Sequence, residues 1–151
     1  MGARLALALA LLAASQQSPA APLKQPHRLF ADDQPIKVVL RGPFTAIVGT
    51  PQNSRAARPA TLELVAPVAE KHAILLSPRG FARRNSDACR FPPLRVEFTA
   101  RPAKTSYFEG QHRLKLTTFC RAVASHQNTI LMEYAAYRLF NVISPVSLRA
   151  S

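Results

Sequence analysis

Short apolar runs, separated by breaks that contain Pro or Gly, make up most of the chain after residue 34. Runs rich in Val, Ile, Leu, Thr and Phe between such breaks are typical of β-strands. Arg41-Gly42-Pro43 lies between the first two runs and suits a hairpin or a bend. We expect strands over residues 36–40, 44–48, 61–65 and 73–76.

Two later segments alternate apolar and polar residues, which indicates half-buried strands over 94–98 and 112–118. The loop between them contains Pro102 and ends in Gly110, as a longer hairpin loop would. Antiparallel pairing that aligns the apolar positions fixes the register and gathers the polar residues on the opposite face. This register places Leu94 opposite Leu116, Val96 opposite Leu114, Glu97 opposite Arg113, and Arg95 beside Lys115.

The same pairing brings the only two cysteines together at the open end of the hairpin. Cys89 lies before the first of these strands and Cys120 lies after the second. A disulfide closing a loop of this size stabilises by roughly 3 to 4 kcal/mol in the chain-entropy model. We expect a Cys89–Cys120 disulfide, and the alternative is two separate buried thiols. A zinc site is not expected, because two cysteines so far apart, with only His112 and His126 nearby, match no common zinc motif.

A helix is expected near the C-terminal end of the chain. Residues 129–142 contain no Gly or Pro, Asn128 is a good N-cap, and Pro145 ends the helix. An apolar stripe at helical spacing consists of Met132, Ala135, Ala136, Leu139, Phe140 and Ile143. Such a stripe is normally buried, so we expect the helix to pack against the sheet. The predicted fold class is α+β, with a small twisted antiparallel sheet and one packed C-terminal helix.

Glu133 is the exceptional residue on this helix. It borders the apolar stripe, and no cation lies three or four residues from it. A carboxylate partly covered by packing needs a donor, and the preceding strand offers Lys115 on its non-core face. The alternative is that Glu133 is solvated or bonded to a Tyr hydroxyl.

The first twenty residues have the three-part form of a secretory signal. Arg4 precedes an apolar stretch from Leu5 to Ala14, and small residues follow, with cleavage expected after Ser15 or Ala20. The alternative, a buried or membrane-anchoring helix, is disfavoured because no apolar run reaches the roughly 18 residues of a membrane span. We therefore expect a signal peptide over 1–20, an extended linker over 21–34 and one domain over 35–151. Export to the periplasm or the extracellular space also permits the disulfide.

Composition narrows the function classes further. The chain has 151 residues, 48 % of them apolar, which is enough for one small domain, and a formal net charge of +12. The basic residues are dispersed without aromatic interleaving, which disfavours a specific nucleic-acid groove. The sequence lacks a Gly-x-Ser-x-Gly elbow and a Gly-rich phosphate loop. The four histidines, which we expect to be ordinary, lack ligand spacing; they are His27, His72, His112 and His126.

A series of short motifs over about residues 75–145 resembles the spore-coat kinase family of CotH type. In chain order the motifs are Arg79-Gly80, Arg83-Arg84, Leu94-Arg95-Val96-Glu97-Phe98, Phe108-Glu109-Gly110-Gln111, Leu114-Lys115-Leu116 and Leu131-Met132-Glu133-Tyr134-Ala135-Ala136-Tyr137. The resemblance implies the N-terminal lobe of an atypical protein-kinase-like fold. It implies that Lys115 contacts ATP phosphates and that Glu133 orients this lysine, with magnesium bound in the full-length parent.

The chain also departs from the family. Arg90-Phe91-Pro92-Pro93 stands where relatives tend to carry Lys-rich residues. Its Asp residues all precede Lys115, whereas phosphoryl transfer in this architecture needs acidic residues after the helix. We therefore expect the chain alone to be inactive, and to be completed by a missing C-terminal lobe or a partner protein. The alternative is a non-enzymatic, exported β-rich domain whose basic surface binds anionic envelope or protein partners.

Overall fold

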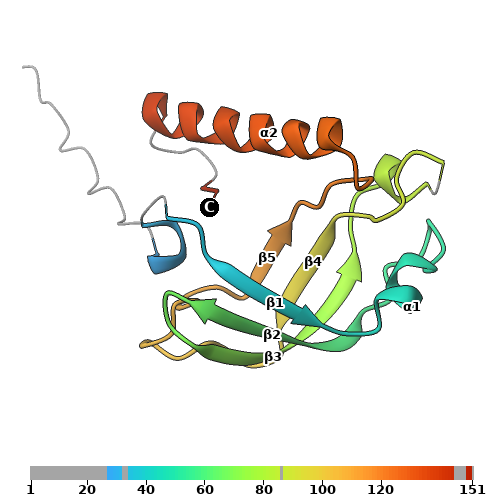
Figure 1. The fold of residues 1–151 in the computed structure, drawn as a ribbon. Helices are drawn as coiled ribbons and strands as arrows, with labels where there is room; N and C mark the ends of the chain where they lie inside the picture. Colours follow the sequence, from blue (N-terminus) through green and yellow to red (C-terminus); the bar gives the residue numbers. More distant parts are fainter. Residues whose placement is uncertain (1–26, 32–33, 86, 145–148, 151) are drawn as a thin grey trace, which may run out of the picture.

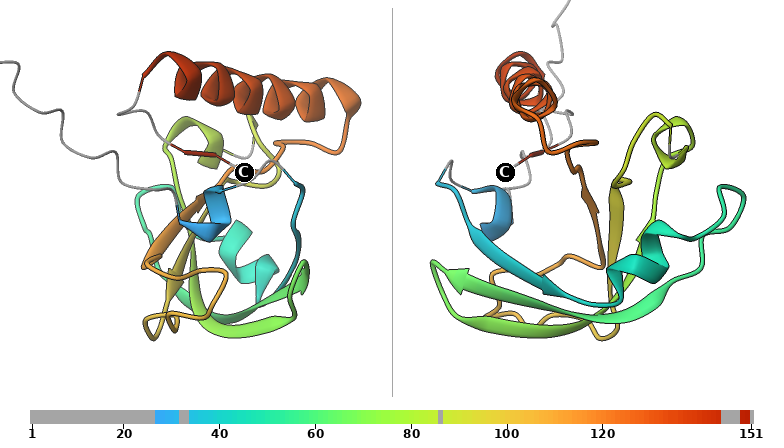
Figure 2. Two further views of the ribbon diagram at one scale, coloured as in Figure 1. Left: turned by 90° about the vertical axis from the view of Figure 1, so that its left-hand side faces the viewer. Right: turned by 45° about the vertical axis from the view of Figure 1, so that its right-hand side comes forward.

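The computed structural model describes residues 27–31, 34–85, 87–144 and 149–150. One antiparallel sheet contains five strands in the order β1-β2-β3-β4-β5, so neighbours in the chain are neighbours in the sheet. The strands are β1 (Lys37–Arg41), β2 (Arg58–Ala66), β3 (Glu70–Pro78), β4 (Leu94–Phe98) and β5 (Arg113–Leu116). The sheet is strongly curled, and helix α2 (Ala124–Ile143) lies beside it (Figure 1, Figure 2). The predicted α+β class, with a small twisted sheet and one packed helix, is confirmed.

The predicted β4–β5 hairpin is confirmed in its register. Leu94 pairs with Leu116 and Val96 with Leu114, while Arg95 with Lys115 and Glu97 with Arg113 occupy the opposite face. Cys89 and Cys120 form the expected disulfide, with their Cα atoms 4.4 Å apart. Backbone bonds from Arg90 and Phe91 to the Cys120 carbonyl add to this junction. The open end of the hairpin is thus closed covalently.

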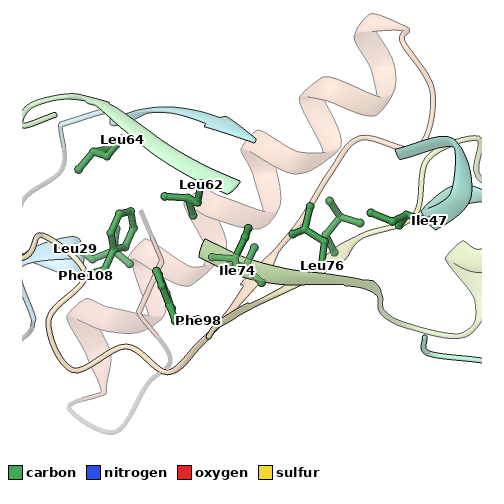
Figure 3. Packing of buried hydrophobic residues seen from close by; sticks show 10 residues of the cluster. Leu29, Ile47, Leu62, Leu64, Ile74, Leu76, Phe98 and Phe108 are labelled. Atoms are coloured by element: carbon green, nitrogen blue, oxygen red, sulfur yellow. The ribbon is translucent and has the colours of Figure 1, made fainter. Parts of the chain in front are cut away.

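The hydrophobic core lies on one face of the curled sheet. Leu62 and Leu64 of β2, with Ile74 and Leu76 of β3, form its centre (Figure 3). Three further buried side chains come from outside the sheet: Leu29, Ile47 and Phe108. Leu29 belongs to the short 3-10 helix η1 (Arg28–Phe30), and Phe108 to the loop between β4 and β5. We call the face of the sheet opposite this core the outer face.

The strand expected over 44–48 is instead the short helix α1 (Phe44–Val48), so this prediction is wrong. Aromatic and β-branched residues favour strands only in so far as they pack well on a pleated surface. Here Phe44 and Ile47, three residues apart, both reach the core region, and Ile47 is fully buried. A helical turn places both on one side, whereas a strand would point them to opposite faces.

Helix α2 differs from its prediction in two respects. It begins at Ala124 and runs through Asn128, so Asn128 is not the N-cap. Its partly buried positions recur three or four residues apart; they are His126, Ile130, Glu133, Tyr134, Tyr137, Arg138 and Asn141. Most of the apolar stripe instead faces outward, with Met132 73 % and Leu139 66 % exposed. The helix therefore packs, but through a polar and aromatic face rather than through the stripe.

The N-terminal predictions fall largely outside the described residues. This holds for the signal-peptide positions Arg4, Leu5, Ala14, Ser15 and Ala20. Within the expected linker over 21–34, the described part contains η1, whose Leu29 is buried in the core. Packing thus begins before residue 35.

Candidate functional site

Lys115 and Glu133 lie on the expected elements, but they do not pair with each other. Lys115 is on the outer face of β5, where its cross-strand partner is Arg95 of β4. The Glu133 carboxylate on α2 lies 3.8 Å from the guanidinium of Arg83, in the 3-10 helix η2 (Ala82–Arg84). The ion pairs among the described residues do not include a Lys115–Glu133 pair. The carboxylate thus has a cation partner that the sequence did not indicate.

Some basic residues on the outer face are paired with a carboxylate and others are not. Near β1, Glu63 of β2 accepts from Arg41 at 3.4 Å and from Lys71 at 3.2 Å. The hydrogen bond from Lys71 is the largest of the effects that hold the pKa of Glu63 below its usual value, and burial opposes it. The two cations therefore share one carboxylate.

At the other side of the outer face, two cations face each other. Arg95 has Ser77 as its neighbour on β3 and Lys115 as its neighbour on β5. Glu97, in the next pair along the same face, is bonded to Arg113 at 3.4 Å instead. Within the described part of the chain, neither Arg95 nor Lys115 has an acidic partner. We call Arg95 and Lys115 the outer-face basic pair.

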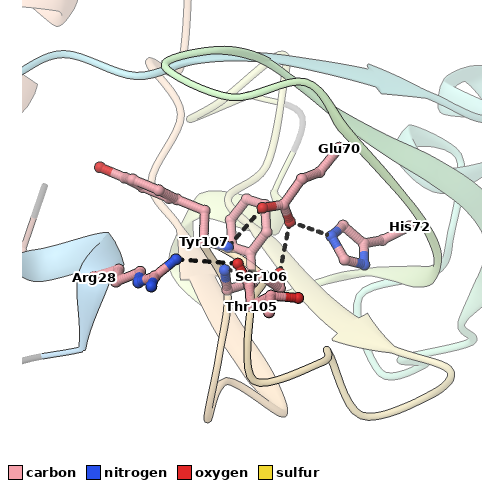
Figure 4. A network of polar contacts seen from close by, with 7 residues as sticks. Arg28, Glu70, His72, Thr105, Ser106 and Tyr107 are labelled. Carbon is pink, nitrogen blue, oxygen red and sulfur yellow. Dashed lines mark hydrogen bonds and ion pairs between the residues drawn. The ribbon is translucent and has the colours of Figure 1, made fainter.

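A network of polar contacts around Glu70 lies on the core side of the sheet (Figure 4). The Glu70 carboxylate accepts from the Ser106 hydroxyl at 2.6 Å, from the Tyr107 backbone amide at 2.6 Å and from His72 Nε2 at 2.9 Å. Arg28 adds a bond to the Thr105 carbonyl at 3.0 Å. These contacts attach the β4–β5 loop to β3 and to η1.

The charge of Glu70 is stabilised by its donors. Burial by itself raises the pKa of Glu70, but the bonds from Ser106, Tyr107 and His72 outweigh burial and leave the pKa below its usual value. His72 in turn lies edge-on to Phe98 and Phe108, with ring centroids 5.4 Å apart in each case. The network therefore holds an ionised carboxylate next to His72, whose ring packs against Phe98 and Phe108.

The order of these contacts differs from that of a Ser–His–acid triad. The Ser106 hydroxyl donates to Glu70, so its proton is not directed to His72. In such a triad the histidine accepts the serine proton and the carboxylate orients the histidine, whereas here Glu70 accepts from both Ser106 and His72. In the described residues, no group of three or more His, Cys, Asp or Glu is arranged to hold a metal ion. The network acts as a clamp on the loop.

Sequence reasoning missed this clamp because its parts are 36 residues apart, and because the strand expected over 73–76 stopped short of Glu70. A signal was present, since Glu70 and His72 stand two positions apart and share one face of a strand. The sequence does not show that Ser106 lies opposite them, because the path of the loop decides that.

No helix in the described part of the chain has the length and the hydropathy needed to span a membrane. A comparison with known proteins found no matching family model, no similar curated protein and no similar solved structure. The resemblance to CotH-type kinases therefore remains a prediction, and the geometry of this chain must carry the functional argument.

Proposed function

We propose that the protein is a non-enzymatic, exported binding domain that recognises an anionic partner through the outer-face basic pair. The supporting observation is the direct opposition of Arg95 and Lys115, neither of which has an acidic ion-pair partner among the described residues. Like charges placed directly opposite each other on a sheet are destabilising. A bound anion offsets that repulsion, whereas the cations beside Glu63 already have a carboxylate.

Two features support export and a binding role. A structural disulfide persists in oxidising compartments, outside the cytosol. The formal net charge of +12 attracts anionic polymers and surfaces over distances of about a Debye length, roughly 8 Å at physiological salt. The net charge attracts anionic partners over this distance, and the outer-face basic pair provides the place where they bind.

Salt elution from a sulfated or phosphorylated matrix tests this function. Arg95→Gln/Lys115→Gln removes two charges from the basic pair. The matched variant Arg41→Gln/Lys71→Gln removes two charges from the same face, where Glu63 already partners them. We expect the first variant to elute at clearly lower salt than the second. Equal elution of the two variants would show that only total charge matters, and the proposed site would be wrong.

A second candidate function is nucleotide binding by a kinase-like N-terminal lobe. The observation that favours it is the order of elements, with Lys115 on the last described strand and Glu133 on the helix that follows. Calorimetry with ATP and magnesium checks it. If Lys115 holds phosphates, Lys115→Ala abolishes the heat of binding while Arg113→Ala, on the same strand and face, retains it. Identical weak binding by both variants rejects this candidate.

A further inference from the structure

A small cavity lies next to the disulfide junction, and neither residue of the outer-face basic pair lines it. Its volume is about 40 Å³, and Ile47, Val48 and Pro78 form apolar parts of its wall. Thr50, Arg84 and Arg90 supply polar parts of the lining. One water needs about 10 to 15 Å³ on this measure, so the space suits about three waters or one four-oxygen anion.

Arg84 is fixed at the wall of this cavity. Its Nη2 donates to the backbone carbonyls of Pro51 and Ser54, in the loop that follows α1. The Nε of the same guanidinium is buried and has no hydrogen-bond partner. Buried donors in native proteins are nearly always satisfied, by protein or by a bound species. The guanidinium is thus held in place while its buried Nε–H remains without a partner.

Charge around the cavity is positive and uncompensated. None of the lining residues is acidic. In the described part of the chain, Arg84, Arg90 and Arg55 form no ion pair. Burial lowers the pKa of Arg84, and the nearby charge of Arg55 lowers it further. The charge of Arg55 thus acts on Arg84, and neither guanidinium has an ion-pair partner among the described residues.

We infer that this cavity binds a small oxyanion of the phosphate or sulfate class, held by Arg84 and Arg90, with Arg55 adding to the attraction. Guanidinium groups match oxyanions because their planar N–H donors align with pairs of oxygens. The site does not depend on the proposed function, because neither Arg95 nor Lys115 lines it. The anion is either free or the terminal group of a larger molecule.

Thermal unfolding and calorimetry of the full chain with its disulfide intact test the inference. Phosphate replaces chloride at constant ionic strength, and we expect a saturable rise in Tm with phosphate and a measurable heat of binding. Arg90→Gln and Arg55→Gln should each weaken phosphate binding, Arg90→Gln by about tenfold, the loss of one charge-assisted bond. Arg101→Gln, an exposed change in the β4–β5 loop, should leave it unchanged.

The second arm identifies the source of the anion. Phosphatidic acid vesicles present the same phosphate group on a membrane, against vesicles of neutral lipid. Binding of inorganic phosphate but not of phosphatidic acid vesicles indicates that the ligand is a free anion. Binding of phosphate and of the vesicles indicates that the site is open to a lipid headgroup. Either result supports the proposed cavity site if Arg90→Gln weakens the binding. Equal effects of chloride and phosphate, or equal losses in Arg101→Gln and Arg90→Gln, would overturn it. Arg84→Gln serves as a further variant only if circular dichroism shows that it folds.

Discussion

The sheet buries its apolar side chains, whereas helix α2 leaves most of its apolar stripe exposed. In the sheet, Leu64 and Leu76 are at most 1 % exposed, whereas on α2 Met132 and Leu139 are largely exposed. The sheet is thus stabilised by burial on its core face, as its alternating pattern requires. The helix has a stripe of comparable hydrophobicity that contributes little to the packing of the described residues.

The difference shows that an apolar pattern identifies an element without showing which side of it is covered. On α2, the inward face includes Tyr134, Tyr137 and the Glu133 carboxylate that contacts Arg83. Isolated helices shorter than about 12 to 15 residues are only marginally stable in water. Helix α2 has 20 residues, so its own backbone hydrogen bonds contribute to its stability. Removing side chains from the two regions should therefore have very different effects.

The largest expected effect is in the core. Leu76→Ala deletes a fully buried side chain that packs beside Ile47 (Figure 3). We expect a loss of about 3 to 5 kcal/mol in the free energy of unfolding, from lost burial and from the cavity that remains. Urea denaturation followed by circular dichroism measures it. A loss below about 1 kcal/mol would mean that the sheet does not depend on this core.

The disulfide comes next. Cys89→Ser/Cys120→Ser opens a loop with a sequence separation of 31. The chain-entropy model gives a loss of about 3 to 4 kcal/mol. The reference is the unreduced parent under the same denaturant conditions, and mass spectrometry confirms its thiol count. Two free thiols in protein purified from an oxidising compartment would contradict the structure at this junction.

The Glu70 clamp gives a smaller effect that depends on pH. Glu70→Gln keeps the size of the side chain but removes the charge that Ser106, Tyr107 and His72 stabilise. We expect a loss of about 1 to 2 kcal/mol in unfolding free energy at pH 7. The pKa of Glu70 is lowered by folding, so this contribution is present above its ordinary pKa of 4.5 and is lost as the pH falls through the lowered value.

Unfolding free energies of the parent and of Glu70→Gln, measured between pH 7 and pH 3, give the test. The gap between the two curves should narrow with acid, below about pH 4.5. Glu109→Gln, a nearby carboxylate in the same loop without an ion-pair partner among the described residues, is the matched control and should show little gap at any pH. A constant gap for Glu70→Gln would mean that its charge plays no part in the clamp.

These sites also show where sequence reasoning succeeded and where it stopped. The β4–β5 register and the Cys89–Cys120 disulfide were predictable, because alternation excludes a one-residue slip and the register that aligns the apolar positions places the cysteines together. The helix over 44–48 was not predictable from composition, since its turn is imposed by Ile47 reaching the core. The contacts between residues far apart in the chain were not predicted. The Glu70 clamp and the contact of Arg83 with Glu133 depend on the paths of loops, which the local sequence pattern does not indicate.

Gly110 closes the loop that Glu70 clamps, and it offers a comparison between two glycines. Gly110 has φ +73°, and a Cβ there would overlap the ring of His27. Gly80 has φ +80° with nothing within 4 Å of such a Cβ. In both alanine variants the left-handed backbone conformation costs about 1 kcal/mol of stability. Only Gly110→Ala must also displace the side chain of His27. We expect Gly110→Ala to lower Tm further than Gly80→Ala, and equal shifts would contradict the close approach of Gly110 to His27.

The smallest expected effect lies on α2 and completes the comparison with Leu76. Leu139→Ala removes the same atoms as Leu76→Ala, but from a side chain that is 66 % exposed. Alanine is also slightly better than leucine as a helix former. We therefore expect a change within about 0.5 kcal/mol in the unfolding free energy of the isolated chain. A loss comparable to that of Leu76→Ala would mean that the stripe is buried in solution, and the contrast between sheet and helix would then fail.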